Sequence, residues 1–209
     1  RIIIIKVESA NEMGDMTVKN LILEIMGKHS NLILTDENNK ILDSIKRVSH
    51  DKSSVREVLP GKTYVFPPSQ DKKNPMELEE SSFSSLLHVQ EGQKIQDFLY
   101  KTYTGISPIM AAEICHEAKL DASDACEMTA EKEHALFTAF SNTMEQVKAG
   151  TFSPAVYYQK PGGKILDFGV LPMTQFDGLY AKAYPTVSAL LEGFYTERDN
   201  AAHIRQKAH

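Results

Sequence analysis

Hydrophobic and polar positions over residues 1–48 follow the pattern of short β-strands. Runs rich in Ile, Leu and Val alternate with polar turns, and they predict strands over 1–8, 21–26, 31–35 and 41–48. The polar turn 36–39 lies between the last two strands and predicts a hairpin. We therefore expect an antiparallel meander that leads into a proline-rich connection over 49–75.

The spacing of apolar residues becomes helical after residue 76. Apolar positions three and four apart predict helices over 81–89, 94–102, 108–119 and 129–148. Ser107 suits the N-cap of the third helix, because Pro108 occupies its first turn. A Pro-Gly-Gly turn at 161–163 then predicts a hairpin within a β segment over 151–176.

A final helix is predicted over 184–209. It becomes more polar towards its end, which indicates the start of a coiled coil. Together the elements predict an α+β fold in which a β-rich part precedes a helical one. The predicted domains are a β-rich part, a helical domain, a β-hairpin segment and the coiled-coil start, over 1–75, 76–150, 151–183 and 184–209.

The composition is that of a folded globular chain. Of 209 residues, 42% are hydrophobic and 24% are charged, which excludes a wholly disordered chain and allows one or two domains. No stretch approaches 18 uninterrupted apolar residues, so we expect no membrane span. The first residue is Arg1 and a strand-like run follows at once, so we interpret the chain as a fragment of a longer protein.

The two cysteines, Cys115 and Cys126, do not form a CxxC pair. His116 is next to Cys115, but adjacent helical side chains point about 100° apart and suit one metal ion poorly. We therefore expect two reduced structural cysteines in a reducing, cytoplasmic compartment, and neither a metal nor another cofactor.

The net charge is −5 and the excess of acid lies in the middle of the chain. Residues 71–150 hold 7 basic and 14 acidic side chains. A protein that binds nucleic acid through bulk charge alone should be basic. Binding to RNA would therefore require a local basic patch.

One candidate for nucleic-acid binding is the turn Gly105-Ile106-Ser107-Pro108 between two short helices, the pattern of a helix-hairpin-helix element. Gly105 permits a tight turn, and the free N–H groups that follow Ser107 can bind a backbone phosphate. An ordinary helical corner packed into a core explains the same spacing.

A second candidate is the polar segment that follows the strand ending near residue 26. Its possible donors to phosphate or bases are Lys28, His29, Ser30 and Asn31. A basic patch would form there, if the hairpin folds back, from Lys28, His29, Lys46, Arg47 and Arg56. An ordinary surface turn fits the segment equally well. No nucleophile, zinc-protease, Walker or dinucleotide-binding signature is present, so we predict that the chain is not an enzyme.

The run LILEIMGKHSNLIL over 21–34 is highly distinctive, and it resembles the NFACT amino-terminal domain family. Several further runs resemble the same family, and they follow one another in the family's order. The other runs lie at 41–48, 55–61, 64–68, 105–108, 168–172 and 190–208. The resemblance implies a fold like that of formamidopyrimidine-DNA glycosylases, with an antiparallel β-sandwich portion before the helix-hairpin-helix domain. It also implies a ribosome quality-control factor that binds tRNA and the large ribosomal subunit carrying a stalled peptidyl-tRNA. In bacteria such a factor recruits alanyl-tRNA, and the ribosome adds a carboxy-terminal alanine tail to the nascent chain.

The resemblance also implies tRNA-binding residues. Arg1 matches the arginine of an Asp–Arg pair needed for tailing, and Glu24, Ile25 and Met26 match a second functional patch. We expect Glu24 to orient Arg1 or to accept a hydrogen bond from a base amino group.

Two alternatives come from other functional classes. An older name of the family implies a surface adhesin that binds fibronectin or fibrinogen. A nucleic-acid enzyme of the glycosylase class is the other, but its amino-terminal catalytic residues and four-cysteine zinc finger are not found in this sequence.

Overall fold

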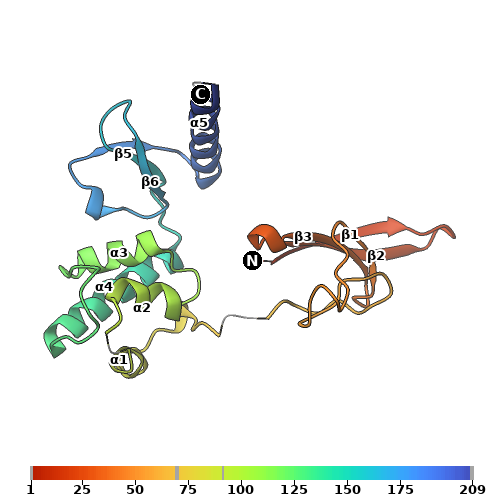
Figure 1. Cartoon of the computed structure of the whole chain (residues 1–209), viewed down its shortest axis with the longest axis horizontal. Helices are drawn as coiled ribbons and strands as arrows, with labels where there is room; N and C mark the ends of the chain where they lie inside the picture. Colours follow the sequence, from red (N-terminus) through yellow and green to blue (C-terminus); the bar gives the residue numbers. More distant parts are fainter. Residues whose placement is uncertain (1, 69–70, 91, 208–209) are drawn as a thin grey trace. The chain divides into compact units, whose positions relative to one another are not determined.

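The computed structural model describes residues 2–68, 71–90 and 92–207, with side chains up to residue 201. The chain divides into two compact units, Arg1–Gln70 and Asp71–His209, which Figure 1 shows. The division falls inside the predicted connection, and each unit has an apolar core of its own. The finer division of the chain into four domains stays a prediction.

The first unit is built on a four-stranded antiparallel sheet in the order β1-β2-β3-β4. Its strands are β1 (Ile2–Ala10), β2 (Met16–Glu24), β3 (Asn31–Asp36) and β4 (Ile41–Ser44). The predicted meander is confirmed. Strand β2 begins five residues earlier than predicted, because it pairs with β1 along its whole length.

The connection after β4 covers one face of this sheet. Alternation along the strands places Ile22, Ile33 and Ile41 on that face, where all three are buried. Val58 and Tyr64 of the connection pack against them. Within residues 2–68, the layer that packs on the sheet is therefore the irregular connection after β4 and not a second sheet. The expected β-sandwich is not seen in this described part of the unit.

The outer strand β1 contributes little to this core. Ile3, Ile4, Ile5 and Val7 remain 44–50% exposed, although they lie on both faces of the strand. The buried apolar surface of the sheet therefore belongs to β2, β3 and β4, and it lies under the connection.

Four helices form the core of the second unit. They are α1 (Glu80–His88), α2 (Ile95–Thr102), α3 (Pro108–Glu117) and α4 (Ala130–Ala149), and all four were predicted to within two residues at nearly every end. Ser107 caps α3 as expected, since its Oγ accepts a hydrogen bond from the amide of Met110 at 3.2 Å. Cys115 and Cys126 are free thiols inside this core, and burial raises the pKa of Cys115 to about 12 and that of Cys126 to about 11.

A small sheet and a long helix complete this unit. The sheet has the order β6-β5-β7, with β5 (Ala155–Tyr158), β6 (Ile165–Gly169) and β7 (Tyr180–Ala183). Helix α5 (Val187–Lys207) packs Leu190 against β5, and the two are side by side in Figure 1. Strand β7 was not predicted, because all four of its side chains are exposed and no alternation marks it.

Two short 3-10 turns connect these layers. They are η2 (Pro75–Glu77), which precedes α1, and η3 (Thr174–Phe176), which follows β6.

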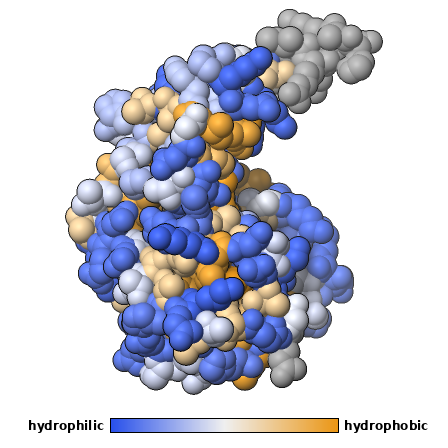
Figure 2. Space-filling model, turned by 90° about the vertical axis from the view of Figure 1, so that its left-hand side faces the viewer, coloured by the Kyte–Doolittle hydropathy of each residue, from blue (hydrophilic) through white to orange (hydrophobic). Residues whose placement is uncertain are grey.

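The face seen in Figure 2 is mostly hydrophilic, with apolar residues exposed between the charged ones. Among the helices that the structure describes, none is both long and apolar enough to cross a membrane.

A buried carboxylate joins helix α3 to η3. Glu113 is only 2% exposed, and it accepts hydrogen bonds from the amide and the hydroxyl of Thr174, both at 2.6 Å, and from the amide of Gln175 at 3.0 Å. These donors are the free groups at the start of η3. Glu113 therefore fixes the segment between β6 and β7 against the helical core.

We expect Glu113→Ala to lower the free energy of unfolding of the second unit by about 3 kcal/mol, because two backbone amides lose a charged acceptor. The matched control is Glu117→Ala, one turn further along α3, where the side chain is exposed. Urea unfolding followed by helical circular dichroism measures both variants. Equal, small effects would contradict the connecting role of Glu113.

Candidate functional site

The candidate site lies at the end of β2, where the sheet of the first unit meets its covering connection. Asn20, Ile22 and Glu24 alternate along β2 on the buried face of the sheet. The chain continues from Glu24 through Ile25 and Met26 into the 3-10 turn η1 (Gly27–His29). Gly27 has a φ of +55°, a conformation that side chains with a Cβ rarely adopt.

Two residues of the connection bind the carboxylate of Glu24. Arg56 donates from Nη2 to Oε2 at 2.5 Å, and the hydroxyl of Tyr64 donates to Oε1 at 2.9 Å. Glu24 is 2% exposed and the Arg56 side chain 14% exposed. The guanidinium carbon of Arg56 also lies 5.8 Å from the centre of the Tyr64 ring. We call these three residues the Glu24 cluster.

The surroundings raise the pKa values of Arg56 and Tyr64, the two partners of Glu24. Burial acts to lower the pKa of Arg56, but the hydrogen bond and the charge of Glu24 outweigh it and raise that pKa. Burial, and then the hydrogen bond to Glu24, raise the pKa of Tyr64. At neutral pH Arg56 is therefore a cation and the Tyr64 hydroxyl is neutral.

The Glu24 cluster also fixes the backbone beyond it. Arg56 Nη1 donates to the carbonyl oxygen of Val65 at 2.8 Å, and the rings of Tyr64 and Phe66 meet edge to face with their centres 5.4 Å apart. Together with the hydrogen bond from the Tyr64 amide to the carbonyl oxygen of Asn39, the carboxylate at the end of β2 therefore holds residues 64–66 of the connection in place.

Hydrogen bonds shape the exposed turn next to this cluster. The amide of Met26 donates to Ser30 Oγ at 3.0 Å, which closes the turn. Asn31 Nδ2 donates to the carbonyl oxygen of Lys46 at 2.8 Å, and the Lys46 amide donates back to Asn31 Oδ1 at 2.9 Å. The ammonium of Lys46 donates to the carbonyl oxygen of Lys28 at 3.1 Å. The hairpin thus brings Lys46 onto the turn that carries Lys28.

The predicted basic patch is smaller than expected. Lys28, His29 and Lys46 come together, and within the described residues none of them forms an ion pair with a carboxylate. Arg47, the residue after Lys46, pairs with Asp43 at 3.2 Å, so it adds no unpaired positive charge to this group.

Arg56 also differs from its prediction. It lies inside the unit because its charge is balanced by Glu24, so it adds nothing to the exposed positive surface.

The residues predicted from the family resemblance occupy different environments. Glu24 is buried with both carboxylate oxygens occupied by Arg56 and Tyr64, so an open position for a base amino group is not present. Ile25 is 46% exposed and Met26 is half-buried. Arg1 lies outside the described residues.

The helix-hairpin-helix turn, the first of the two candidates, belongs to the second unit. Gly105 has a φ of +79°, which permits the tight turn between α2 and α3, and Ser107 uses its hydroxyl to cap α3. An apolar cavity of about 230 Å³ lies beside this turn, between α3, α4 and the segment after β6.

Sequence reasoning missed Tyr64 and Phe66. Glu24 could have been assigned to the buried face, because it continues the alternation of Asn20 and Ile22. Its partners lie 32 and 40 residues further along the chain, and no local pattern marks them. In the part of the chain that the structure describes, no group of three or more His, Cys, Asp or Glu side chains is arranged to hold a metal ion.

We expect Glu24→Gln to lower the free energy of unfolding of the first unit by about 3 kcal/mol, because it leaves the Arg56 cation unpaired in a largely buried place. The matched control, Asp43→Asn, breaks an exposed pair and should cost less than about 1 kcal/mol. The double variant Glu24→Gln/Arg56→Met should recover part of the loss, because no unpaired charge remains. Chemical denaturation measures all three, and additive losses in the double variant would argue against a coupled pair.

Comparisons with known proteins give this geometry a family context. The family model of NFACT N-terminal and middle domains matches residues 1–209. The Rqc2 homolog RqcH of Bacillus subtilis is 37% identical over 209 residues, which are 100% of this chain and 34% of the relative. RqcH of Streptococcus pneumoniae is 44% identical over 92 residues, 44% of this chain and 17% of that protein. The chain therefore spans about a third of the length of the first of these curated relatives.

Solved structures show the same relationship. The fibrinogen-binding protein from Staphylococcus aureus matches with a TM-score of 0.74 and 32% identity, over 93% of this chain and 66% of that one. The N-terminal part of the fibronectin/fibrinogen-binding protein from Streptococcus suis matches with a TM-score of 0.66 and 26% identity, over 94% of this chain and 64% of that one. Since the family model covers every residue of the sequence, the chain belongs to the family of NFACT N-terminal and middle domains.

Proposed function

We propose that this chain is the tRNA-binding module of a ribosome quality-control factor. In this proposal it binds tRNA and the large ribosomal subunit that carries a stalled peptidyl-tRNA, in the cytoplasm. It supports carboxy-terminal alanine tailing of the nascent chain by presenting alanyl-tRNA. The ribosome carries out the peptide transfer, so the chain has no catalytic residue in this scheme.

The observation that carries the proposal is the exposed turn after the Glu24 cluster. Lys28, His29 and Lys46 lie there without carboxylate partners among the described residues, on a turn that its own hydrogen bonds fix. Positive side chains on a fixed turn suit a phosphate backbone, because phosphate contacts position a nucleic acid before its bases are recognised. Membership of the NFACT family and the similarity to proteins named RqcH, an Rqc2 homolog, support the same function.

The small basic surface also fits a limited role for this module. The chain as a whole is acidic, with a net charge of −5, so non-specific binding along an RNA should be weak. Binding through a few phosphates at one turn gives a small footprint, which suits one part of a larger factor whose other parts supply further contacts.

We expect the chain to bind tRNA with an affinity that falls as salt rises, and Lys28→Ala to make this dependence less steep by about one unit of log K against log salt. Lys46→Ala should act in the same direction. The control is Lys40→Ala, which removes an exposed lysine at the other end of β3. Filter binding over a series of salt concentrations measures these slopes. An equal change for Lys28→Ala and Lys40→Ala would count against the turn as the RNA-binding surface.

A second experiment tests the assigned RNA. The polypeptide that carries this chain is immunoprecipitated from cells, and the bound RNA is sequenced for the natural protein and for Glu24→Ala. We expect large-subunit RNA together with alanine tRNA, and loss of the tRNA in the variant because the end of β2, which leads into the turn, loses its contacts with Arg56 and Tyr64. No RNA above background would contradict the proposal.

A second candidate function rests on the solved structures. Both reported neighbours are described as binding fibrinogen, and one also as binding fibronectin. If this chain is an adhesin, immobilised fibronectin should capture it in a saturable way, and Lys28→Ala should bind tRNA no less well than the natural chain. The two functions therefore give opposite results in the same pair of assays.

A further inference from the structure

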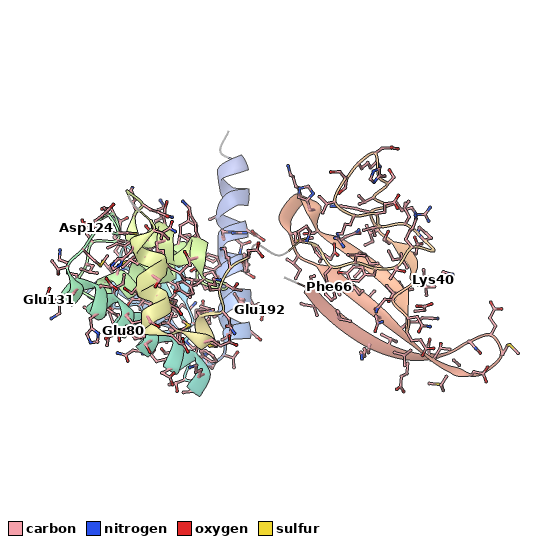
Figure 3. All side chains as sticks on the ribbon, turned by 90° about the horizontal axis from the view of Figure 1, so that it is seen from below. Lys40, Phe66, Glu80, Asp124, Glu131 and Glu192 are labelled. Carbon is pink, nitrogen blue, oxygen red and sulfur yellow. The ribbon has the colours of Figure 1, made fainter. Side chains whose placement is uncertain are left out.

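Phe66 is an exposed aromatic residue that the proposed function has not used. It is 60% exposed, although a phenylalanine normally contributes its ring to a core. Figure 3 shows Phe66 at one end of the sheet of the first unit, with Lys40 away from it. Its position next to the Glu24 cluster makes it a candidate for contact with a ligand.

The ring of Phe66 is held in place although it is exposed. It packs edge to face against Tyr64, whose hydroxyl is bound to Glu24. The carbonyl oxygen of Val65, the preceding residue, accepts a hydrogen bond from Arg56. Pro67 and Pro68 follow, and a proline restricts the residue before it to extended conformations. The site therefore presents a flat apolar surface that loses little conformational entropy when it binds.

We propose that Phe66 is a stacking residue for an unpaired base of the bound RNA, an inference that rests on the proposed function. Every base has an apolar face, so an exposed aromatic ring beside positive charges is the usual arrangement for single-stranded nucleic acid. Lys28 follows Glu24 by four residues, so its Cα lies within about 14 Å of that of Glu24. A base stacked on Phe66 and a phosphate bound at Lys28 would therefore belong to nucleotides a few positions apart in one RNA segment. Glu24 is a positioning residue in this arrangement, since it acts on the base only through Tyr64 and Arg56.

The charges of the cluster favour this ligand over a free anion. Glu24 neutralises Arg56, so the immediate neighbourhood of the Phe66 ring carries no unpaired cation from the cluster. The unpaired cations lie on the neighbouring turn, at Lys28 and Lys46. An apolar platform with positive charge to one side matches a nucleotide, whose base is apolar on its face and whose phosphate is charged.

The absence of tryptophan from the sequence makes a direct test possible. In Phe66→Trp the new indole is the only one in the chain, and a stacked base quenches its fluorescence. The control is Met13→Trp, in the exposed turn between β1 and β2 at the opposite end of β2. The probe is the anticodon stem-loop of an alanine tRNA, with loop nucleotides replaced one at a time by abasic residues.

We expect the stem-loop to quench Phe66→Trp and to leave Met13→Trp unchanged, with quenching lost for one abasic position. Phe66→Leu, which keeps an apolar side chain without a ring, should weaken binding by about 5- to 100-fold. Its salt dependence should stay unchanged, since no phosphate contact is removed. Phe66→Trp should bind at least as tightly as the natural chain.

The outcomes separate this inference from the proposed function. If the natural chain binds the stem-loop but Phe66→Leu binds equally well and Phe66→Trp is not quenched, stacking on Phe66 is wrong while RNA binding stands. If the natural chain binds no stem-loop and no tRNA at any salt concentration, the proposed function fails and this inference fails with it.

Discussion

The buried carboxylate of Glu24 is the constraint on which the first unit depends. A glutamate at the end of β2 faces the same side as Ile22, so the sheet buries it whether or not it has partners. A buried, unpaired carboxylate is costly, and the cost is met only when Arg56 and Tyr64 of the connection reach it. Backbone hydrogen bonds to Asn39 and Ile41 hold residues 61–64 of the connection, and the Glu24 side chain adds a hold on Arg56 and Tyr64. The backbone of Val65 and the ring of Phe66 are placed by the same interaction.

The second unit solves a similar problem with Glu113. There a carboxylate on a core helix accepts three hydrogen bonds from a segment between strands, and it holds that segment without a cation. The donors are backbone amides and a hydroxyl, which stabilise a charge because they are fixed dipoles. In both units a buried glutamate on a regular element positions an irregular segment. In the first unit the carboxylate also binds the guanidinium of Arg56. This guanidinium in turn donates a hydrogen bond to the carbonyl oxygen of Val65 and so fixes the backbone there.

The parts of the fold that were predictable are those with a local cause. The meander follows from alternation and polar turns, and α3 and α4 follow from Ser107, Thr129 and Gly150, which mark their ends within a residue or two. The candidate site was predicted only in part: Lys28 and Lys46 come together because one hairpin brings them there. Arg56 was assigned to the same surface by its charge alone. Its true position depends on Glu24, 32 residues earlier, and a pair so far apart leaves no periodic trace in a single sequence. Strand β7 escaped prediction for another reason, since its exposed side chains carry no pattern.

A buried ion pair is rarely the most stable choice for a core, because apolar residues of similar volume often give equal or greater stability. The Glu24 cluster therefore requires an explanation other than stability. An apolar contact between the sheet and the connection would tolerate small shifts, whereas the hydrogen bonds of Arg56 and Tyr64 allow one geometry. A surface that recognises a nucleotide needs that kind of precision, because misplacement by about 1 Å weakens oriented contacts severely. The cluster therefore fits the proposal of an RNA-binding surface beside it, because it holds Val65 and Phe66 in one geometry while its own charges are balanced.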